Sequence, residues 1–370
     1  MTKKIRVLES IRQGMVGGGE THVYDLSTRL NKELFEPIVL SFTDGEMVTA
    51  LRDSGIETHV IHTTRPFDTK VVQSVISLIK ERDIDIVHAH GTRAASNVLK
   101  AAKKVGKPVI YTVHGWSFNL NQSWPVKFLR KQIEGYIARR TNLNICVSES
   151  NRSTGKKELR GFESIVINNG VSLEKFDHSI SSFSIATEIG KKEGEIWLGF
   201  LARMTFQKDP LTLLRAFKIA LEKKSNLRLL MVGSGELEQE VREFVTKERL
   251  HEKVKMLPFR ADVPAILSAI DIYCLPSLWE GLPIGILEAM AMKKPVIATR
   301  VDGSKEIVND NVGVLIEKEN VDEMAKAMID LSSSQDRLSS MGENAYQMIL
   351  KSFSVEQMVE KTEGAYQRIL

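Results

Sequence analysis

The chain has 370 residues, of which 42% are hydrophobic and 26% charged, and a formal net charge of +4 at pH 7. This length exceeds one ordinary core and predicts two domains, and the composition is typical of a soluble globular protein, which excludes the disordered and fibrous classes. The sequence has no apolar run that could span a bilayer and no secretory signal, and its two cysteines lie in apolar segments without metal-ligand spacing, so we expect a cytoplasmic protein.

Short β-branched runs alternate with segments of helical period along the first half of the chain. The helical segments include residues 20–31 and 69–81, in which apolar side chains are spaced by three and four. This alternation predicts a parallel sheet that helices cover on both faces. The predicted strands are residues 4–10, 36–42, 84–90, 108–114, 142–148 and 164–170.

The alternation pauses at residues 172–194, which are polar and rich in serine, and then resumes. The pause is typical of a linker. The strands predicted after it are residues 196–202, 227–233, 254–259, 271–277, 295–301 and 312–317. We therefore predict two doubly wound, Rossmann-like α/β domains that face each other across an interdomain cleft. Their bounds are residues 1–172 and 196–352, with a linker at 173–195 and a closing amphipathic helix at 353–370.

Positive charge is concentrated in the first half of the chain. Residues 1–175 contain 26 lysines and arginines against 18 acidic residues, and residues 100–140 contain nine against the single acid Glu134. The aromatic residues Trp116, Phe118, Trp124 and Phe128 are interleaved with these cations. The pattern indicates either nucleic acid or an anionic membrane surface as a partner, and a solvated helix face explains it equally well.

Uncommon residues follow the predicted strands in both halves. In open α/β sheets, ligands bind beyond the carboxyl ends of the strands, and solvated charges scattered at random would not favour these positions. The residues concerned are the Gly17-Gly18-Gly19 cluster, His114, Arg203, Lys208, Gly233, Gly235, Glu280 and Asp302.

Two of these features suit phosphate. Glycines at a helix start let backbone N–H groups approach a phosphate, although Gly18 and Gly19 fit neither a P-loop nor a dinucleotide fingerprint, and a simple helix-entry turn explains them equally well. Arg203 and Lys208 leave the end of one strand together. A guanidinium fork and a point charge side by side suit a diphosphate.

Glu280 and Glu288 flank a glycine-containing loop. Taken alone, Glu280 is a solvated carboxylate and Glu288 a helix-favouring residue near a helix start. The loop can present backbone N–H groups and a helix N-terminus to phosphates, and each carboxylate can accept from two hydroxyls. We predict that this region binds a nucleotide-sugar, because a glycosidase pair would not need the nearby cations. The predicted donor-binding loop consists of Gly281, Leu282, Pro283, Ile284 and Gly285.

His88 and His90 share one face of a predicted strand, and His114 ends the next. No carboxylate cluster or cysteine accompanies them in the sequence, so structural or substrate-contacting histidines are favoured over metal ligands. We predict no metal site and no bound cofactor.

Seven motifs, which follow one another along the chain in the order of the family, resemble family 4 of the retaining glycosyltransferases, which have the GT-B fold. SLWEGLPIGILEAMAMKKPVIATRVDG resembles the E-x7-E region of that family, and LARMTFQKDP resembles its Arg/Lys segment. The similarity also covers GGGETHVYDLSTRL, the histidine motifs VHAHG and TVHGW, VGSGE, and the hinge INNGV. In the family pattern AMAxGxPV a glycine is usual at the position that we assign to Lys294, so the turn there is expected to differ.

The resemblance implies sugar transfer with retention from a nucleotide-sugar, with UDP as the nucleotide by family frequency, and without a metal. It implies that Arg203 and Lys208 neutralise the leaving diphosphate, that Glu288 holds the ribose, and that Glu280 holds the sugar hydroxyls. His114 would contact the sugar, Gly18 and Gly19 the diphosphate or the acceptor, and Gly233 and Gly235 the donor.

We therefore expect a cytoplasmic glycosyltransferase that acts on a saccharide or lipid-linked acceptor in polysaccharide synthesis. Residues 100–140 would contact an anionic membrane at its inner face, and no nucleic acid is expected as a partner. Two alternatives remain open: a nucleotide-sugar 2-epimerase of the same fold, and a non-catalytic partner subunit that binds nucleotide-sugar. Closure of the two domains on the donor is also expected.

Overall fold

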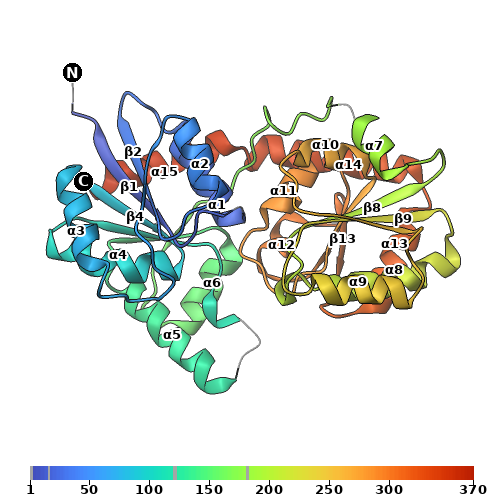
Figure 1. Ribbon diagram of the computed structural model, residues 1–370, viewed down its shortest axis with the longest axis horizontal. Coiled ribbons are helices and arrows are strands. Elements are labelled where there is room, and N and C mark those ends of the chain that lie inside the picture. Colours follow the sequence, from blue (N-terminus) through green and yellow to red (C-terminus); the bar gives the residue numbers. More distant parts are fainter. Residues whose placement is uncertain (1–2, 16, 120–122, 181–182) are drawn as a thin grey trace. The chain divides into compact units, whose positions relative to one another are not determined.

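The computed structural model describes residues 3–15, 17–119, 123–180 and 183–370, and the chain divides into two compact units. The first unit comprises Met1–Gly170 together with Val355–Leu370, and the second comprises Val171–Ser354. Each unit is built on one parallel sheet, with helices on both of its faces (Figure 1). The prediction of two doubly wound α/β halves is confirmed.

The sheet of the first unit has the strand order β3-β2-β1-β4-β5-β6-β7. The order reverses between β1 and β4, whose connections leave toward opposite edges, so the carboxyl ends of these two strands border a crevice where α/β sheets bind ligands. The strands are β1 (Ile5–Ile11), β2 (Phe35–Ser41), β3 (Glu57–Val60), β4 (Ile86–His90), β5 (Val109–Val113), β6 (Leu143–Cys146) and β7 (Ile165–Val166).

Helices cover both faces of this first sheet because its strands are apolar on both sides. All five residues of β5 are buried. One face packs against α3 (Val72–Glu81) and α4 (Thr92–Lys104), and the other against α1 (Gly18–Arg29) and α15 (Val355–Ile369). The remaining helices are α2 (Glu46–Asp53), α5 (Trp124–Ala138), α6 (Glu149–Glu158) and the 3-10 turn η1 (Ser117–Asn119).

The sheet of the second unit has the order β10-β9-β8-β11-β12-β13, which reverses between β8 and β11. Its strands are β8 (Ile196–Leu201), β9 (Leu227–Val232), β10 (Val254–Leu257), β11 (Ile272–Leu275), β12 (Val296–Thr299) and β13 (Gly313–Ile316). Its helices are α7 (Phe183–Ile189), α8 (Pro210–Lys223), α9 (Glu238–Lys247), α10 (Val263–Ala269), α11 (Ile284–Ala291), α12 (Asp302–Ile307), α13 (Val321–Leu331), α14 (Gln335–Ser352) and the 3-10 turn η2 (Phe206–Lys208).

The structure differs from the sequence-based outline in two places. Each predicted strand overlaps an observed one, but β3 was missed because its four residues alternate weakly and none of them is buried. Residues 173–195, predicted as a linker, belong to the second unit and include α7. Ile185 and Ile189 of α7 are buried, and a helix this short shows too few apolar turns to reveal a period.

The C-terminal segment of the chain returns to the first unit. Val171 pairs with Ser354 in an isolated parallel bridge, and the Val171 N–H donates to the Phe353 carbonyl at 2.9 Å. The following helix, α15, then packs Val359 and Tyr366 against the first sheet. This packing carries a tyrosine into the interior of the first unit, where it meets polar residues of β1 and β4.

Candidate functional site

The predicted cations of the second unit lie at the reversal point of its sheet. Arg203 follows β8 and is exposed, and its guanidinium makes no hydrogen bond or ion pair within the described parts of the chain. Lys208 ends η2, and Glu280 follows β11, the neighbour of β8. The strand order thus gathers Lys208 and Glu280, which are 72 positions apart in sequence.

Lys208 and Glu280 form an ion pair between Nζ and Oε1, with only 17% and 7% of their side chains exposed. Two further hydrogen bonds fix the loops that carry them. The Leu278 N–H donates to the Gln207 carbonyl at 2.8 Å, and Gln207 Nε2 donates to the Trp279 carbonyl at 2.9 Å. The structure therefore brings a predicted phosphate-binding cation and a predicted sugar-binding carboxylate into direct contact.

Gly233 and Gly235 allow the loop after β9 to pack closely against the loop after β8. A Cβ atom would lie 2.3 Å from the Ala202 carbonyl oxygen at Gly233 and 2.4 Å from that of Met204 at Gly235. The Met204 N–H donates to the Ser234 carbonyl at 3.0 Å. These glycines let the loop after β9 lie against the Arg203 loop, which is a structural requirement separate from any contact with a donor.

The predicted loop Gly281–Gly285 leads into α11, and Glu288 lies half-buried in the second turn of that helix. Tyr273 lies beneath the loop: its hydroxyl donates to the Leu201 carbonyl at 3.2 Å, and a Cβ on Gly285 would lie 2.5 Å from that hydroxyl. Burial, and then the negative charges of Glu288 and Glu280, raise the pKa of Tyr273 well above its usual value. Both predicted carboxylates therefore act electrostatically on one buried ring.

The turn after α11 corrects one sequence assignment. The residue in the left-handed conformation is Lys293, with φ 56°, and not Lys294. Glycine favours that conformation because it has no Cβ, so Lys293 is the position at which the family pattern has glycine. Lys294 instead donates from Nζ to the Ser268 carbonyl at 3.3 Å.

In the first unit, a buried polar network occupies the reversal point between β1 and β4. Glu9 lies on β1, His88 and His90 on β4, and Tyr366 on α15. The Tyr366 hydroxyl donates to Glu9 Oε1 at 2.5 Å, and Glu9 Oε2 is 2.8 Å from His90 Nε2. His88 Nδ1 is 2.7 Å from the Tyr366 hydroxyl, and its Nε2 is 2.7 Å from Thr112 Oγ1. Glu9 and Tyr366 were not among the residues predicted from the sequence.

His114, a predicted site residue, is attached to this network. It follows β5, is half-buried, and places Nε2 3.1 Å from His90 Nδ1. A Cβ on Gly19 would lie 3.7 Å from the His114 ring, so the structure brings these two predicted residues together. The His22 ring meets His114 edge-on, with centroids 4.8 Å apart, and its Nδ1 is 3.0 Å from Asn169 Oδ1. Helix α1 begins at Gly18, as the glycine cluster predicts.

One negative charge and several neutral rings share this interior. Burial opposes ionisation of Glu9, but the charge of His88 and the hydrogen bonds from His88 and His90 hold the pKa of the carboxyl well below its usual range. Burial is the main cause that lowers the pKa of His22 to about 3, that of His90 to about 4 and that of His114 well below its usual value. At neutral pH these three rings are uncharged.

Two groups in the network have the spacing of metal ligands. Within the described residues, the ligand atoms of His22, His90 and His114, and those of Glu9, His88 and His90, lie within 4.8 Å of one another. The His90 nitrogens are both within hydrogen-bond distance of neighbours, Glu9 on one side and His114 on the other. We interpret the cluster as a hydrogen-bonded network, in which each His90 nitrogen already has a partner.

Helix α5 carries the basic and aromatic residues noted in the sequence. Trp124, Phe128 and Leu129 are 75%, 50% and 59% exposed, and the first two rings stack with centroids 5.6 Å apart. Figure 1 shows the amino-terminal end of α5 projecting from the lower edge of the first unit. Glu134 is fully buried and accepts from Thr92, Tyr111 and Ser117, so this acid anchors the helix. None of the described helices is long and apolar enough to cross a bilayer.

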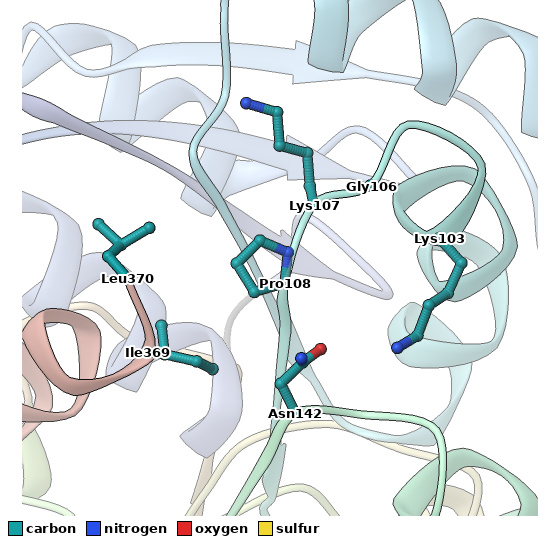
Figure 2. Close-up of a pocket in the computed structure, with 7 residues that line it drawn as sticks. All are labelled: Lys103, Gly106, Lys107, Pro108, Asn142, Ile369 and Leu370. Carbon is teal, nitrogen blue, oxygen red and sulfur yellow. The ribbon is translucent and has the colours of Figure 1, made fainter.

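A hollow also lies in the first unit, at the end of the sheet where β5 and β6 begin (Figure 2). Figure 2 shows Pro108 and Asn142 between Lys103 on one side and Ile369 and Leu370 on the other. Pro108 precedes β5 and Asn142 precedes β6, so the hollow lies at the amino ends of these strands. His114 follows the other end of β5, so this hollow is separate from the predicted site.

Two family models match the chain. The model of glycosyl transferases group 1 matches residues 182–348, and the model of glycosyltransferase family 4 matches residues 16–175. A galactosyltransferase of Escherichia coli, named UDP-Gal:alpha-D-GlcNAc-diphosphoundecaprenol alpha-1,3-galactosyltransferase, is 32% identical over 81% of this chain and 79% of its own. The putative glycosyltransferase EpsD of Bacillus subtilis is 26% identical over 81% and 82%.

Solved structures share the fold over the whole chain. Anabaena HepE in complex with UDP-glucose has a TM-score of 0.87 and 23% identity, and covers 98% of this chain and 100% of its own. Sucrose-phosphate synthase from Thermosynechococcus elongatus has a TM-score of 0.84 and 15% identity, with 99% of each chain covered. At these identities the likeness establishes the fold alone.

Proposed function

Because the chain belongs to glycosyltransferase family 4, we propose that it is a retaining, metal-independent enzyme that transfers a sugar from a UDP-sugar to a lipid-linked saccharide. Glycosyltransferase activity follows from the family. The donor and acceptor classes are supported by the name of the E. coli relative, which specifies UDP-galactose and a diphosphoundecaprenol-linked sugar. The HepE complex with UDP-glucose adds a second UDP-sugar on the same fold.

The observation that carries the proposal is the Lys208–Glu280 pair beside exposed Arg203 at the reversal point of the second sheet. When the bond between the sugar and the diphosphate breaks, its electron pair leaves with the diphosphate and the sugar becomes cation-like. Arg203 and Lys208 stabilise the diphosphate charge as it grows, and preorganised groups of this kind contribute most in the transition state.

The carboxylates act on the uncharged parts of the donor. We assign Glu280 to hydroxyls of the transferred sugar and Glu288 to the ribose, because an ionised carboxylate accepts from two neighbouring hydroxyls. Glu280 also contacts Lys208. This contact couples the group that we assign to the sugar with the group that we assign to the diphosphate, on the two sides of the bond that breaks. Gly281–Gly285 approach the donor through their backbone.

In the first unit, we assign His114 to the transferred sugar and Gly18 and Gly19 to the diphosphate or the acceptor. Gly19 lies against the His114 ring, and a side chain at that position would narrow the approach to it. The neutral state of His114 supports this role, because an uncharged ring does not repel the cation-like sugar.

We also propose that α5 contacts an anionic membrane, where a lipid-linked acceptor resides. Trp124, Phe128 and Leu129 supply exposed apolar surface, and Lys127 supplies positive charge between them. Flotation with phosphatidylglycerol vesicles tests this contact. We expect the double variant Trp124→Ser/Phe128→Ser to bind at least about 100-fold less, since each buried aromatic ring contributes about 1.5–3 kcal/mol. Phe259→Ser, which removes an exposed ring of the second unit, is the matched control.

The activity itself is tested by NMR of purified protein with UDP-galactose, UDP-glucose, UDP-N-acetylglucosamine or GDP-mannose, in EDTA, with and without a diphosphate-linked lipid acceptor. We expect one UDP-sugar to release UDP and to give an α-linked product. An epimerised donor without acceptor would establish the 2-epimerase alternative. Membrane binding with every donor unchanged would favour the non-catalytic subunit, and turnover that needs added Mn²⁺ would contradict metal independence.

A further inference from the structure

A continuous series of hydrogen bonds connects helix α15 to His114 inside the first unit. Tyr366 Oη is 2.5 Å from Glu9 Oε1, and the other carboxylate oxygen of Glu9 is 2.8 Å from His90 Nε2. The series ends where His90 Nδ1 lies 3.1 Å from His114 Nε2. Glu9, His90 and Tyr366 are each at most 2% exposed, so water does not compete for these contacts.

The charge on Glu9 sets the direction of every bond in this series. An ionised carboxylate can only accept, so the proton between Glu9 and His90 belongs to His90 Nε2. Burial and the neighbouring His88 lower the pKa of His90 to about 4, so the ring has only this one proton at neutral pH. His90 Nδ1 is therefore an acceptor, and His114 Nε2 must donate to it. His114 is neutral as well, which leaves its Nδ1 without a proton.

We propose that Glu9 is a positioning residue for His114: through His90 it fixes the tautomer in which His114 donates from Nε2 and offers Nδ1 as an acceptor. This inference rests on the proposed function, in which His114 contacts the transferred sugar. It adds the chemistry of that contact, since an unprotonated Nδ1 accepts from a sugar hydroxyl. Nδ1 has no hydrogen-bond partner among the described residues, and His114 is half-buried, so a ligand can reach it.

Helix α15 helps to keep Glu9 charged. A buried carboxylate without donors takes up a proton, because burial disfavours the charged form. Tyr366 donates to one oxygen of Glu9, and His88 Nδ1 lies 3.2 Å from the other. A protonated Glu9 could donate to His90 Nε2, and each later bond would then reverse and leave the proton of His114 on Nδ1.

The first test reads the tautomer directly by ¹⁵N NMR of histidine-labelled full-length protein at neutral pH, without substrate and with EDTA to exclude metal binding. The His114 signal is assigned by its loss in His114→Asn. We expect the wild-type ring to be protonated on Nε2. We expect Glu9→Gln, whose amide N–H can donate to His90, to shift a large fraction of His114 to the Nδ1-protonated tautomer.

Thr112→Val is the matched control. It removes a hydrogen bond of the same buried network, the one between Thr112 Oγ1 and His88 Nε2, but lies outside the path from Glu9 to His114. We expect this variant to retain the wild-type tautomer. A wild-type His114 protonated on Nδ1 would overturn the proposal even if Glu9→Gln did not fold. An unchanged tautomer in Glu9→Gln, or equal shifts in both variants, would overturn it as well.

Turnover of the UDP-sugar provides the second readout. Glu9→Gln should lower kcat/KM by about 10- to 100-fold, because an N–H would face a sugar hydroxyl where an acceptor is required. Thr112→Val should remain within about 3-fold of wild type, since its changed bond does not reach His114. If the tautomer inverts and turnover is unchanged, the role of His114 in the proposed function fails while the control of its tautomer by Glu9 stands.

Discussion

The reversal points of the two sheets hold charged side chains in different environments. In the first unit, Glu9 is fully buried and keeps its charge through hydrogen bonds from Tyr366 and His90. In the second unit, Arg203 is exposed and its charge is hydrated, whereas Lys208 is 17% exposed and paired with Glu280. Burial with donors fixes the direction of hydrogen bonds, whereas exposure keeps the Arg203 guanidinium available for a multiply charged ligand. The first arrangement suits orientation and the second suits neutralisation.

The comparison predicts that the largest catalytic effects lie in the second unit. Arg203→Ala and Lys208→Ala should each lower kcat by about 10²–10³-fold, because each removes a charge that acts mainly in the transition state. UDP binding, measured by calorimetry, should weaken far less. Lys218→Ala is the control, because Lys218 forms an exposed ion pair with Glu248 in the same unit. Near-normal turnover by both variants would remove these cations from the mechanism.

Lys294 sharpens the comparison, because it carries a half-buried positive charge in the second unit. Its Nζ makes one long hydrogen bond, to the Ser268 carbonyl, and burial lowers its pKa to about 8. The unfolded value is near 10.4, so the charged form destabilises the fold below pH 8, and this cost disappears as the pH rises from 8 to about 10.5. Lys294→Met should therefore stabilise the protein at pH 7 by up to about 3 kcal/mol.

Thermal unfolding of Lys294→Met and wild type at pH 7 and at pH 10 provides the measurement. The gain in melting temperature should be clear at pH 7 and small at pH 10. Lys224→Met is the control, since Lys224 is also half-buried and also donates to a backbone carbonyl, that of Ser332, at 3.2 Å. A gain that is equal at both pH values would show that the effect comes from apolar packing and not from the charge.

Loss of a hydrogen bond in the buried network of the first unit should lower the stability of the protein. Tyr366→Phe removes the hydroxyl that donates to the Glu9 carboxylate, and the loss of a hydrogen bond to a buried charge should lower the free energy of unfolding by about 2 kcal/mol. Tyr24→Phe removes an exposed hydroxyl contact with Ser54 in the same unit and should cost less than about 0.5 kcal/mol. Equal losses in the two variants, measured by urea denaturation, would show that Glu9 does not depend on Tyr366.

From the sequence, the positions of the charged residues at strand ends could be predicted, but the buried network of the first unit could not. Arg203, Lys208 and Glu280 follow strands, and a parallel sheet brings strand ends together, so local patterns were enough. Glu9 sits inside an apolar strand, and its partner Tyr366 is 357 residues away on a helix that packs across the sheet. The only local signal was a carboxylate within an apolar run, and it could not reveal which distant hydroxyl would satisfy it. Helix α7 was missed for a simpler reason: its two buried isoleucines are too few to show a period.

The smallest predicted effect concerns the turn after α11, where backbone strain and not charge is tested. Lys293 holds φ at 56°, a conformation that costs an L-residue about 1–2 kcal/mol and glycine almost nothing. Lys293→Gly and Lys293→Ala both remove the ion pair with Glu343, at 2.8 Å, and the contact with the Tyr346 ring. The glycine variant should therefore be more stable than the alanine variant by about 1 kcal/mol in urea denaturation. Equal stability would mean that the turn relaxes to a right-handed conformation when the lysine is removed. The ion pair with Glu343, and not the tight turn before β12, would then be what holds Lys293 in the left-handed conformation.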